Sequence, residues 1–265
     1  MKEARGLKIV IACPSYRRPK VETLDYIPFC RVYVDEGEFE AYKKANPPTA
    51  DIVSCKKGIQ GNLCRIRNHI IREELERNGA DVLLIIDDDM KGIYYFEQKV
   101  RHKVEGDKVV DFVAKHSIMA KELGAYFWGV NVTDDKQYYR EYTPFSTVSY
   151  VGGPFQCFLK GNDCYYDENL PLKEDYDMTL QQLNKHRVVF RVNKFYYNVK
   201  QAENVGGCAT YRNFERERDQ LMRLRRKWGG RIVHIDKSSR SHNSEKTRGK
   251  AFDFNPVINV PIKGV

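Results

Sequence analysis

The chain has 265 residues, of which 42% are hydrophobic. This is enough for one sizeable core and excludes a short peptide, a coiled coil and a disordered tail. Lys and Arg number 45 against 36 Asp and Glu, which gives a formal net charge of +9. A positive balance of this size indicates a polyanionic partner.

The excess positive charge is concentrated near one end of the chain. Residues 212–250 contain 13 Lys and Arg against five Asp and Glu, a net charge of +8, and the remainder is almost neutral. We therefore expect a polyanion to meet the protein through this basic stretch.

The seven cysteines are odd in number, scattered and without a Cys-x-x-Cys pair. This spacing favours neither a disulfide framework nor a zinc site, and it indicates a reducing compartment. The apolar run at residues 7–13 is too short for a signal peptide or a membrane span. We expect a cytoplasmic protein that does not enter a membrane.

In chain order, short apolar runs alternate with stretches of helical periodicity, which is typical of an α/β domain with a mostly parallel central sheet. Strands are predicted at residues 7–12, 31–35, 51–54, 82–86, 125–130, 147–151, 155–160, 188–192 and 231–236. Helices are predicted from Asn62 to Asn78, and at residues 111–123, 176–184 and 211–228. A polar loop at residues 238–250 and an extended tail at 254–265 complete the chain.

We expect one domain over residues 1–265. Its predicted parts are a nucleotide-binding half (1–125), an acceptor or catalytic half (126–210), and a basic helix with loop and tail (211–265).

Three consecutive aspartates, Asp87, Asp88 and Asp89, follow the apolar strand predicted at residues 82–86. Ligands of open α/β sheets bind at the carboxyl ends of the strands. Clustered carboxylates there suit Mg²⁺ or Mn²⁺, which take oxygen ligands. The alternative is that these acids cap the following turn.

Two further loops are suited to a nucleotide. IACPSYRRP, which contains Pro14, Tyr16 and Arg18, follows the first strand and offers a ring for stacking and guanidinium groups for a diphosphate. KKGIQGNLCRIRN, with Gln60 and Arg67, leads into a helix whose start favours anions. An ordinary proline turn and an ordinary glycine turn are the alternatives.

A fourth segment begins with Gly152 and Gly153 and reaches Glu174 and Asp175 about twenty residues later. The glycines let a sugar or nucleotide lie against the chain, and one of the acids is a candidate general base. Helix capping is the alternative role for these acids.

Taken together, IACPSYRRP, GNLCRIRN, LLIIDDDM and GGPFQCFLKGN with KEDYD resemble a GT-A (Rossmann-like) glycosyltransferase over residues 8–185. More narrowly, they look like the TET-associated glycosyltransferases, a mainly phage-borne family that glycosylates hydroxymethylated pyrimidines in DNA. The resemblance implies a phage enzyme that acts in the host cytoplasm. It also implies a UDP-sugar donor, with glucose as the default sugar and a pentose such as arabinose as the alternative.

The resemblance also assigns donor and metal residues. Asp87 and Asp88 are expected to contact the ribose and uracil side of the nucleotide, and Asp89, with Asp87, to bind the metal. The other expected donor-binding residues are Pro14, Tyr16, Arg18, Gln60, Arg67 and Gly153. A metal-binding histidine near the C-terminus has two candidates, of which we prefer His242 in the polar loop to His234.

For catalysis, the resemblance implies that Asp175 deprotonates the acceptor hydroxymethyl group for an inverting attack, with Glu174 as the second choice. A retaining mechanism is an alternative. The basic helix would then follow a DNA backbone through Arg223, Arg225, Arg226 and Lys227. The alternative to DNA binding is a solvent-exposed helix in which acidic residues are interspersed among the basic ones.

Aromatic residues near position 140 and Trp128 are candidates to stack on an extruded base, although such rings are more often part of a core. Two other functions stay open on the sequence alone: a glycosyltransferase with a protein, lipid or polysaccharide acceptor, and a catalytically silent nucleic-acid-binding module.

Overall fold

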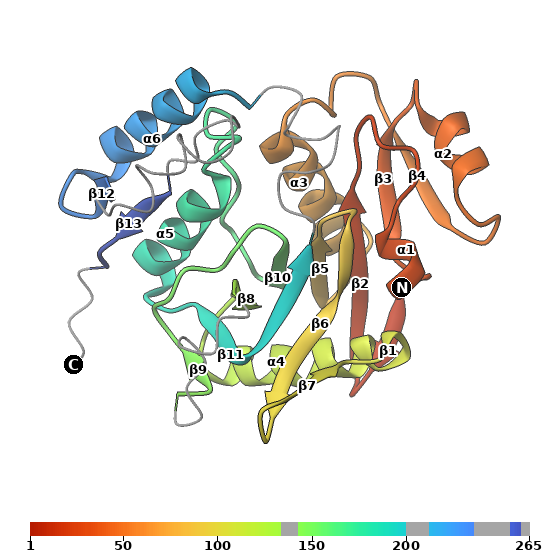
Figure 1. Cartoon of the computed structure of the whole chain (residues 1–265), viewed down its shortest axis with the longest axis horizontal. Helices are drawn as coiled ribbons and strands as arrows, with labels where there is room; N and C mark the ends of the chain where they lie inside the picture. Colours follow the sequence, from red (N-terminus) through yellow and green to blue (C-terminus); the bar gives the residue numbers. More distant parts are fainter. Residues whose placement is uncertain (134–142, 200–211, 236–254, 261–265) are drawn as a thin grey trace.

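A computed structural model describes residues 1–133, 143–199, 212–235 and 255–260. In these residues a sheet of eleven strands runs through the molecule, with helices on both faces (Figure 1). The strands are β1 (Lys2–Ala4), β2 (Leu7–Pro14), β3 (Arg31–Asp35), β4 (Asp51–Cys55), β5 (Val82–Ile86), β6 (Met90–Glu97), β7 (Val100–Lys103), β8 (Phe127–Asn131), β9 (Phe145–Ser146), β10 (Phe155–Leu159) and β11 (Phe190–Val199). Their order is β4-β3-β2-β5-β10-β8-β11-β6-β7, with β1 beside β2 and β9 beside β11.

The helices form two layers. One face of the sheet packs against α1 (Thr23–Tyr26), α2 (Phe39–Ala45) and α4 (Val109–Glu122), and the other face packs against α3 (Leu63–Ile71) and α5 (Glu174–His186). A π-helical turn, Arg72–Arg77, continues α3. The last described helix, α6 (Phe214–Trp228), packs on α5 beside the two-stranded sheet of β12 (Val233–Ile235) and β13 (Pro256–Ile258).

The sheet is mixed and not purely parallel. Strands β4, β3, β2 and β5 are parallel, as the alternation of strands and helices predicts. Strand β10, however, is antiparallel to both β5 and β8, and β6 is antiparallel to β11 and β7. The hydrophobic pattern of a strand shows which residues are buried and not the direction of its neighbour.

Strand β5 is the centre of the arrangement that builds the site. Its five apolar residues are all buried, and it pairs with β2 on one side and β10 on the other. Because β2 and β5 are parallel, the loops after them reach the same edge of the sheet. Antiparallel β10 starts at that edge, where Phe155 is opposite Ile86, and this brings the glycine loop to the aspartates.

Several predicted elements differ in their bounds. The cap at Asn62 is confirmed, since its side chain accepts a hydrogen bond from the Arg65 amide at 3.2 Å. The strand predicted at residues 147–151 is wrong: β9 covers only Phe145–Ser146. Helix α5 begins at Glu174, two residues before the predicted start, which places both candidate acids in its first turn.

Helix α6 is fixed to the start of α5 by buried charges. Lys173, the residue before α5, places its ammonium 2.6 Å from Glu217 of α6, and both side chains are at most 1% exposed. At the far end of α6, Lys227 and Trp228 both bond to the buried Asp177 of α5. No described helix is long and apolar enough to cross a membrane.

Glu217 is buried and pairs with both Lys173 and Arg212, so removing its carboxylate takes a buried charge partner from each cation. We predict that Glu217→Ala lowers the free energy of unfolding by about 3–5 kcal/mol, measured by urea denaturation. Asp219→Ala is the control, because it removes an exposed partner of Arg223 on the same helix and should cost less than about 1 kcal/mol. Equal losses for the two variants would show that the buried pair has no special role.

Candidate active site

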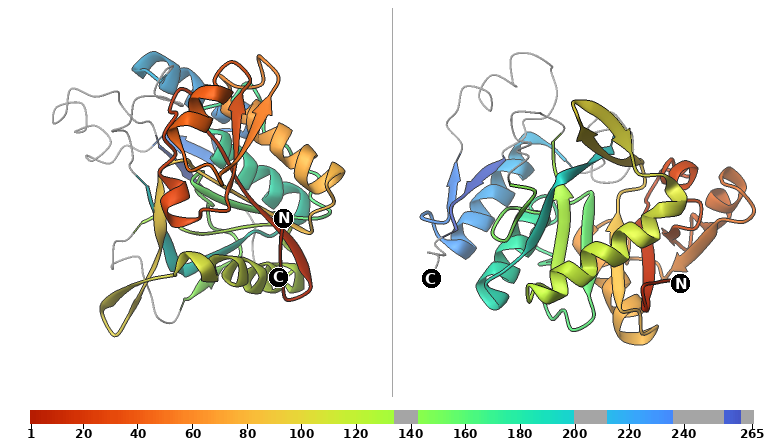
Figure 2. Two further views of the ribbon diagram at one scale, coloured as in Figure 1. Left: turned by 90° about the vertical axis from the view of Figure 1, so that its right-hand side faces the viewer. Right: turned by 90° about the horizontal axis from the view of Figure 1, so that it is seen from below.

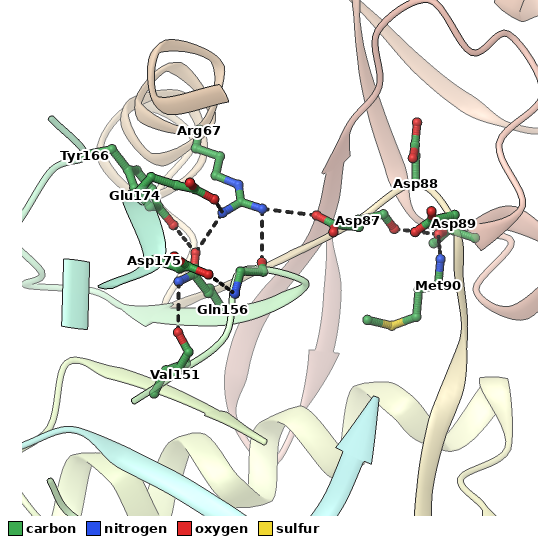
Figure 3. A network of polar contacts seen from close by, with 12 residues as sticks. Arg67, Asp87, Asp88, Asp89, Met90, Val151, Gln156, Tyr166, Glu174 and Asp175 are labelled. Atoms are coloured by element: carbon green, nitrogen blue, oxygen red, sulfur yellow. Dashed lines mark hydrogen bonds and ion pairs between the residues drawn. The ribbon is translucent and has the colours of Figure 1, made fainter. Parts of the chain in front are cut away.

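The aspartate triplet forms a turn that the start of α1 holds in place. The Thr23 hydroxyl donates to the Asp87 carbonyl at 2.6 Å and accepts the Met90 amide at 2.9 Å. The Thr23 amide also bonds to the Asp88 carbonyl at 3.0 Å. These contacts fix where the three carboxyl groups point, and Figure 3 shows Asp87 directed toward Arg67 and Asp88 away from it.

The loop after β2 holds Asp88. Ser15 and Arg18 both hydrogen-bond to its carboxyl group, and Arg18 also lies 3.5 Å from Asp89. Burial raises the pKa of Asp88 to about 6, against the opposing effect of the Arg18 charge. Arg18 and Asp88, two residues expected to bind the donor, are therefore in direct contact.

Arg67 is the hub of the site. Its side chain is only 1% exposed, and its guanidinium contacts four oxygen acceptors from three segments of the chain (Figure 3). The acceptors are the Gly153 carbonyl at 3.0 Å, Gln156 at 3.1 Å, Asp87 at 3.1 Å and Glu174 at 3.3 Å. Arg67 thus joins the aspartate turn, the glycine loop and α5.

The two acids at the start of α5 differ in their environment. Burial, with the nearby charge of Asp175, raises the pKa of Glu174 to about 8, so its protonated form predominates at neutral pH. Asp175 is partly exposed, and its carboxylate accepts hydrogen bonds from the Tyr150 hydroxyl and from the Gly153 and Tyr176 amides. Because Asp175 is also the more exposed of the two acids, a substrate hydroxyl can reach its carboxylate more readily.

Gly153 lies where a side chain has little room. A Cβ atom at this position would be 3.3 Å from Glu174, 3.4 Å from Asp175 and 3.5 Å from Arg67. The missing side chain therefore allows the backbone to approach both acids closely.

The remaining residues expected to bind the donor line the neighbouring loops. Pro14 ends β2 and is buried, and Gln60 bonds to the Ser15 and Tyr33 carbonyls at 3.2 and 2.9 Å. The Tyr16 ring lies beside the Arg17 guanidinium, and its hydroxyl is near Gly61. The two predicted nucleotide loops therefore lie side by side at the sheet edge.

The structure does not complete the predicted metal site. His242 lies outside the described residues, and His234 is exposed on β12 with its Nε2 atom 2.8 Å from the Arg231 carbonyl. Asp87 is 34% exposed, and Asp87 and Asp89 offer the hard oxygen donors that Mg²⁺ or Mn²⁺ requires. Among the described residues, three ligand atoms within 4.8 Å of one another come from Asp163, Cys164 and His186, a separate cluster where Asp163 also pairs with Lys185.

The four basic residues predicted on α6 have different surroundings. Lys227 pairs with Asp167 and Asp177 at 2.9 Å, so part of its role is to anchor the helix. Arg223 is exposed and pairs with Asp219, whereas Arg225 is half-buried against Gly230. Arg223 and the exposed Arg226 line a shallow hollow of about 350 Å³ with Lys227.

Sequence reasoning missed several residues of the site. Tyr150 bonds to Asp175 and stacks on Tyr176 with ring centres 4.3 Å apart. Gln156, which lies within the glycine motif, bonds to both Arg67 and Tyr166. Of the rings considered for base stacking, Trp128 is buried in the core, Phe145 is exposed, and Tyr138, Tyr139 and Tyr142 lie outside the described residues.

The α/β architecture and the acids at the carboxyl edge of its sheet are those of a GT-A glycosyltransferase. The model of the TET-associated glycosyltransferase family matches residues 28–207, which is more than half of the chain. The protein belongs to this family, and it is a glycosyltransferase. No curated protein gives a significant match to the sequence.

Solved structures show only distant similarity. TarS 1–349 of S. aureus, in complex with UDP, is 13% identical with a TM-score of 0.46, and the match covers 83% of this chain and 66% of that one. The chain therefore spans slightly less than two thirds of that fragment. A197 from STIV is 12% identical with a TM-score of 0.41, over 76% of this chain and 89% of that one.

Because Arg67 satisfies four acceptors, a shorter cation cannot replace it. We predict that Arg67→Lys lowers the free energy of unfolding by about 2 kcal/mol or more, since buried acceptors lose their donors. Arg65→Lys on the same helix is the matched control, because Arg65 is exposed and pairs with Glu168, and it should cost less than about 1 kcal/mol. Thermal and urea unfolding measure both, and indistinguishable curves for the two variants would contradict the role of Arg67.

Proposed function

We propose that this glycosyltransferase moves a sugar from a UDP-sugar to the hydroxymethyl group of 5-hydroxymethylcytosine in DNA. The observation that carries the proposal is the placement of Asp175, partly exposed and held by Tyr150 and the Gly153 amide, next to the Arg67–Asp87 pair. Family membership supports the DNA acceptor, and the concentration of positive charge at residues 212–250 is consistent with it.

In this proposal the donor binds along the edge formed by the loops after β2 and β5. Tyr16 stacks on the base, Pro14 and Gln60 shape the loop, and Asp87 and Asp88 face the nucleoside. Arg18 contributes positive charge near the diphosphate, and the Gly153 backbone lies beside the sugar. Arg67, which is buried, acts through Asp87 by holding its carboxylate.

Asp89 and Asp87 would hold a Mg²⁺ or Mn²⁺ ion, with His242 as the proposed third protein ligand. When bound, such an ion supplies Lewis-acid neutralisation of the charge on the departing diphosphate. The chemistry of the two carboxylates fits a hard cation of this kind.

Asp175 is the proposed general base. It takes the proton of the acceptor hydroxyl while the hydroxyl oxygen attacks the anomeric carbon, and the bond from that carbon to UDP breaks. The result is a glycoside of inverted configuration, UDP and a protonated Asp175 that returns its proton to solvent. Glu174, protonated at neutral pH, keeps its buried contact with Arg67 without adding a second negative charge.

The two acids therefore give different predictions. Asp175→Asn should lower kcat by about 10²–10⁴-fold, the usual contribution of a general base. Glu174→Gln should lower it by less than about tenfold, since glutamine resembles the protonated acid in shape and charge. Transfer is measured at neutral pH with UDP affinity as the control, and the reverse order of losses would make Glu174 the base.

Mass spectrometry tests the reaction directly. The protein is incubated with UDP-glucose or a UDP-pentose, Mn²⁺, and DNA containing 5-hydroxymethylcytosine, and the DNA is digested to nucleosides. A hexose or pentose increment on the modified nucleoside is expected. Transfer that occurs only to a protein, lipid or polysaccharide would replace the proposed acceptor, and DNA binding without turnover of any donor would indicate a silent binding module.

The proposed contact between α6 and DNA has its own test. We predict that neutralising Arg223, Arg225 and Arg226 to Gln weakens DNA binding about tenfold at low salt and reduces its salt dependence. UDP affinity should stay within about twofold, because these residues are not among those proposed to bind the donor. Fluorescence anisotropy and calorimetry measure the two affinities, and an equal loss of both would show that the charges serve the fold or the diphosphate.

A further inference from the structure

The β6–β7 hairpin has two faces with different surroundings. On one face, Tyr95 stacks on His102 and contacts Phe195, which packs against Phe112 and His116 of α4. Side chains of paired residues in an antiparallel sheet lie on the same face, and neighbours along a strand alternate. Tyr94 and Phe96 of β6, with Tyr196 of β11, therefore belong to the opposite face.

That opposite face carries a layer of rings under two cations. The Tyr196 ring is stacked with Tyr94 and with Phe96, at centre distances of 5.8 and 5.7 Å. The Arg101 guanidinium lies 4.0 Å from the centre of the Tyr94 ring and 5.8 Å from that of Tyr196. Lys103 lies 4.5 Å from the Tyr26 ring centre, and both cations are exposed. We call these residues of β6, β7 and β11 the hairpin platform.

The hairpin platform lies on the face of the hairpin opposite the rings that contact α4. Strands β2, β5, β8 and β10 direct one set of apolar residues to α3 and α5, and the described members of this cluster include no residue of β6, β7 or β11. The hairpin projects from the body of the molecule, as the right-hand view of Figure 2 shows. The platform thus extends the sheet beyond the area that α3 and α5 cover.

The hairpin platform is also continuous with the candidate active site. Strand β6 begins at Met90, directly after the three aspartates. A chain lying along β6 from the hairpin tip would therefore arrive at the aspartate turn. Lys103 of the platform also lines a hollow together with Lys91, Glu22 and Asp25.

We propose that the hairpin platform binds a single-stranded segment of the acceptor nucleic acid beside the target base. This rests on the proposed function, which places the acceptor at the edge of the sheet where β6 begins. Arg101 presents the outer side of a planar guanidinium, on which a base can stack, while Arg101 and Lys103 together attract phosphates. The rings beneath restrict the movement of the Arg101 guanidinium, so this side chain loses little conformational entropy when a ligand binds.

The proposal fits the geometry of base modification. A base in a duplex must leave the stack to reach a catalytic carboxylate, and the displaced strand then needs a surface that accepts any sequence. Aromatic and guanidinium planes with adjacent cations provide such a surface, because every base has a stacking face and every nucleotide a phosphate.

Paired variants test the platform. Arg101→Gln with Lys103→Gln removes two charges from exposed residues of the hairpin, and Lys43→Gln with Lys44→Gln removes two from exposed residues of α2. Binding of a fluorescent single strand of about 12 nucleotides, with one 5-hydroxymethylcytosine and no donor, is followed by anisotropy. We expect about tenfold weaker binding for the hairpin variant and about twofold for the α2 variant.

A third variant separates stacking from charge. Arg101→Lys keeps the positive charge but loses the planar guanidinium, so the affinity of this variant for the single strand should fall about three- to fivefold. Equal losses for the hairpin and α2 pairs, or undetectable binding of the single strand by the unmodified protein at low salt, would overturn the platform. A wild-type protein that binds the strand through the hairpin and yet transfers no sugar to it would refute the proposed function and leave the platform standing.

Discussion

The contacts of the buried Arg67 guanidinium are the interaction on which the site depends. The aspartate turn, the glycine loop and α5 come from distant parts of the chain, and each presents an oxygen to this one group. A buried cation with a fixed fork of donors is stable only when acceptors surround it, so the three segments stabilise one another's positions. Burial in the same packing, with the nearby charge of Asp175, raises the pKa of Glu174 to about 8.

Buried polar contacts with α6 also hold helix α5 in place. Lys173, immediately before the acids, pairs with Glu217, and Asp177, two residues after them, receives Lys227 and Trp228. The first turn of α5 is therefore fixed on both sides of Asp175 by buried polar contacts. The basic helix α6 therefore helps to position the proposed base, and this role does not depend on whether its outer face binds a polyanion.

Sequence alone predicted the parts of the site that depend on local pattern. The apolar run before Asp87 marks a buried strand, and a parallel neighbour places its carboxyl end beside the loop of Arg18. The contacts of Arg67 and the Tyr150–Asp175 bond were not predictable, since they depend on which strands pair. The direction of β10 decides both, because an antiparallel β10 starts at the edge where β5 ends. No local pattern encodes that direction.

The same distinction applies to charge. Counting residues suggests that 212–250 is the strongest attraction for a polyanion, but Arg212, Arg223 and Lys227 each pair with a carboxylate at 2.6–2.9 Å. Opposite charges at that separation largely cancel in the field felt farther away. Arg101 instead lies over the neutral rings of Tyr94 and Tyr196, which hold a cation without cancelling its charge. The guanidinium on the hairpin therefore adds to the attraction that the partly paired charges of the basic helix exert on a phosphate.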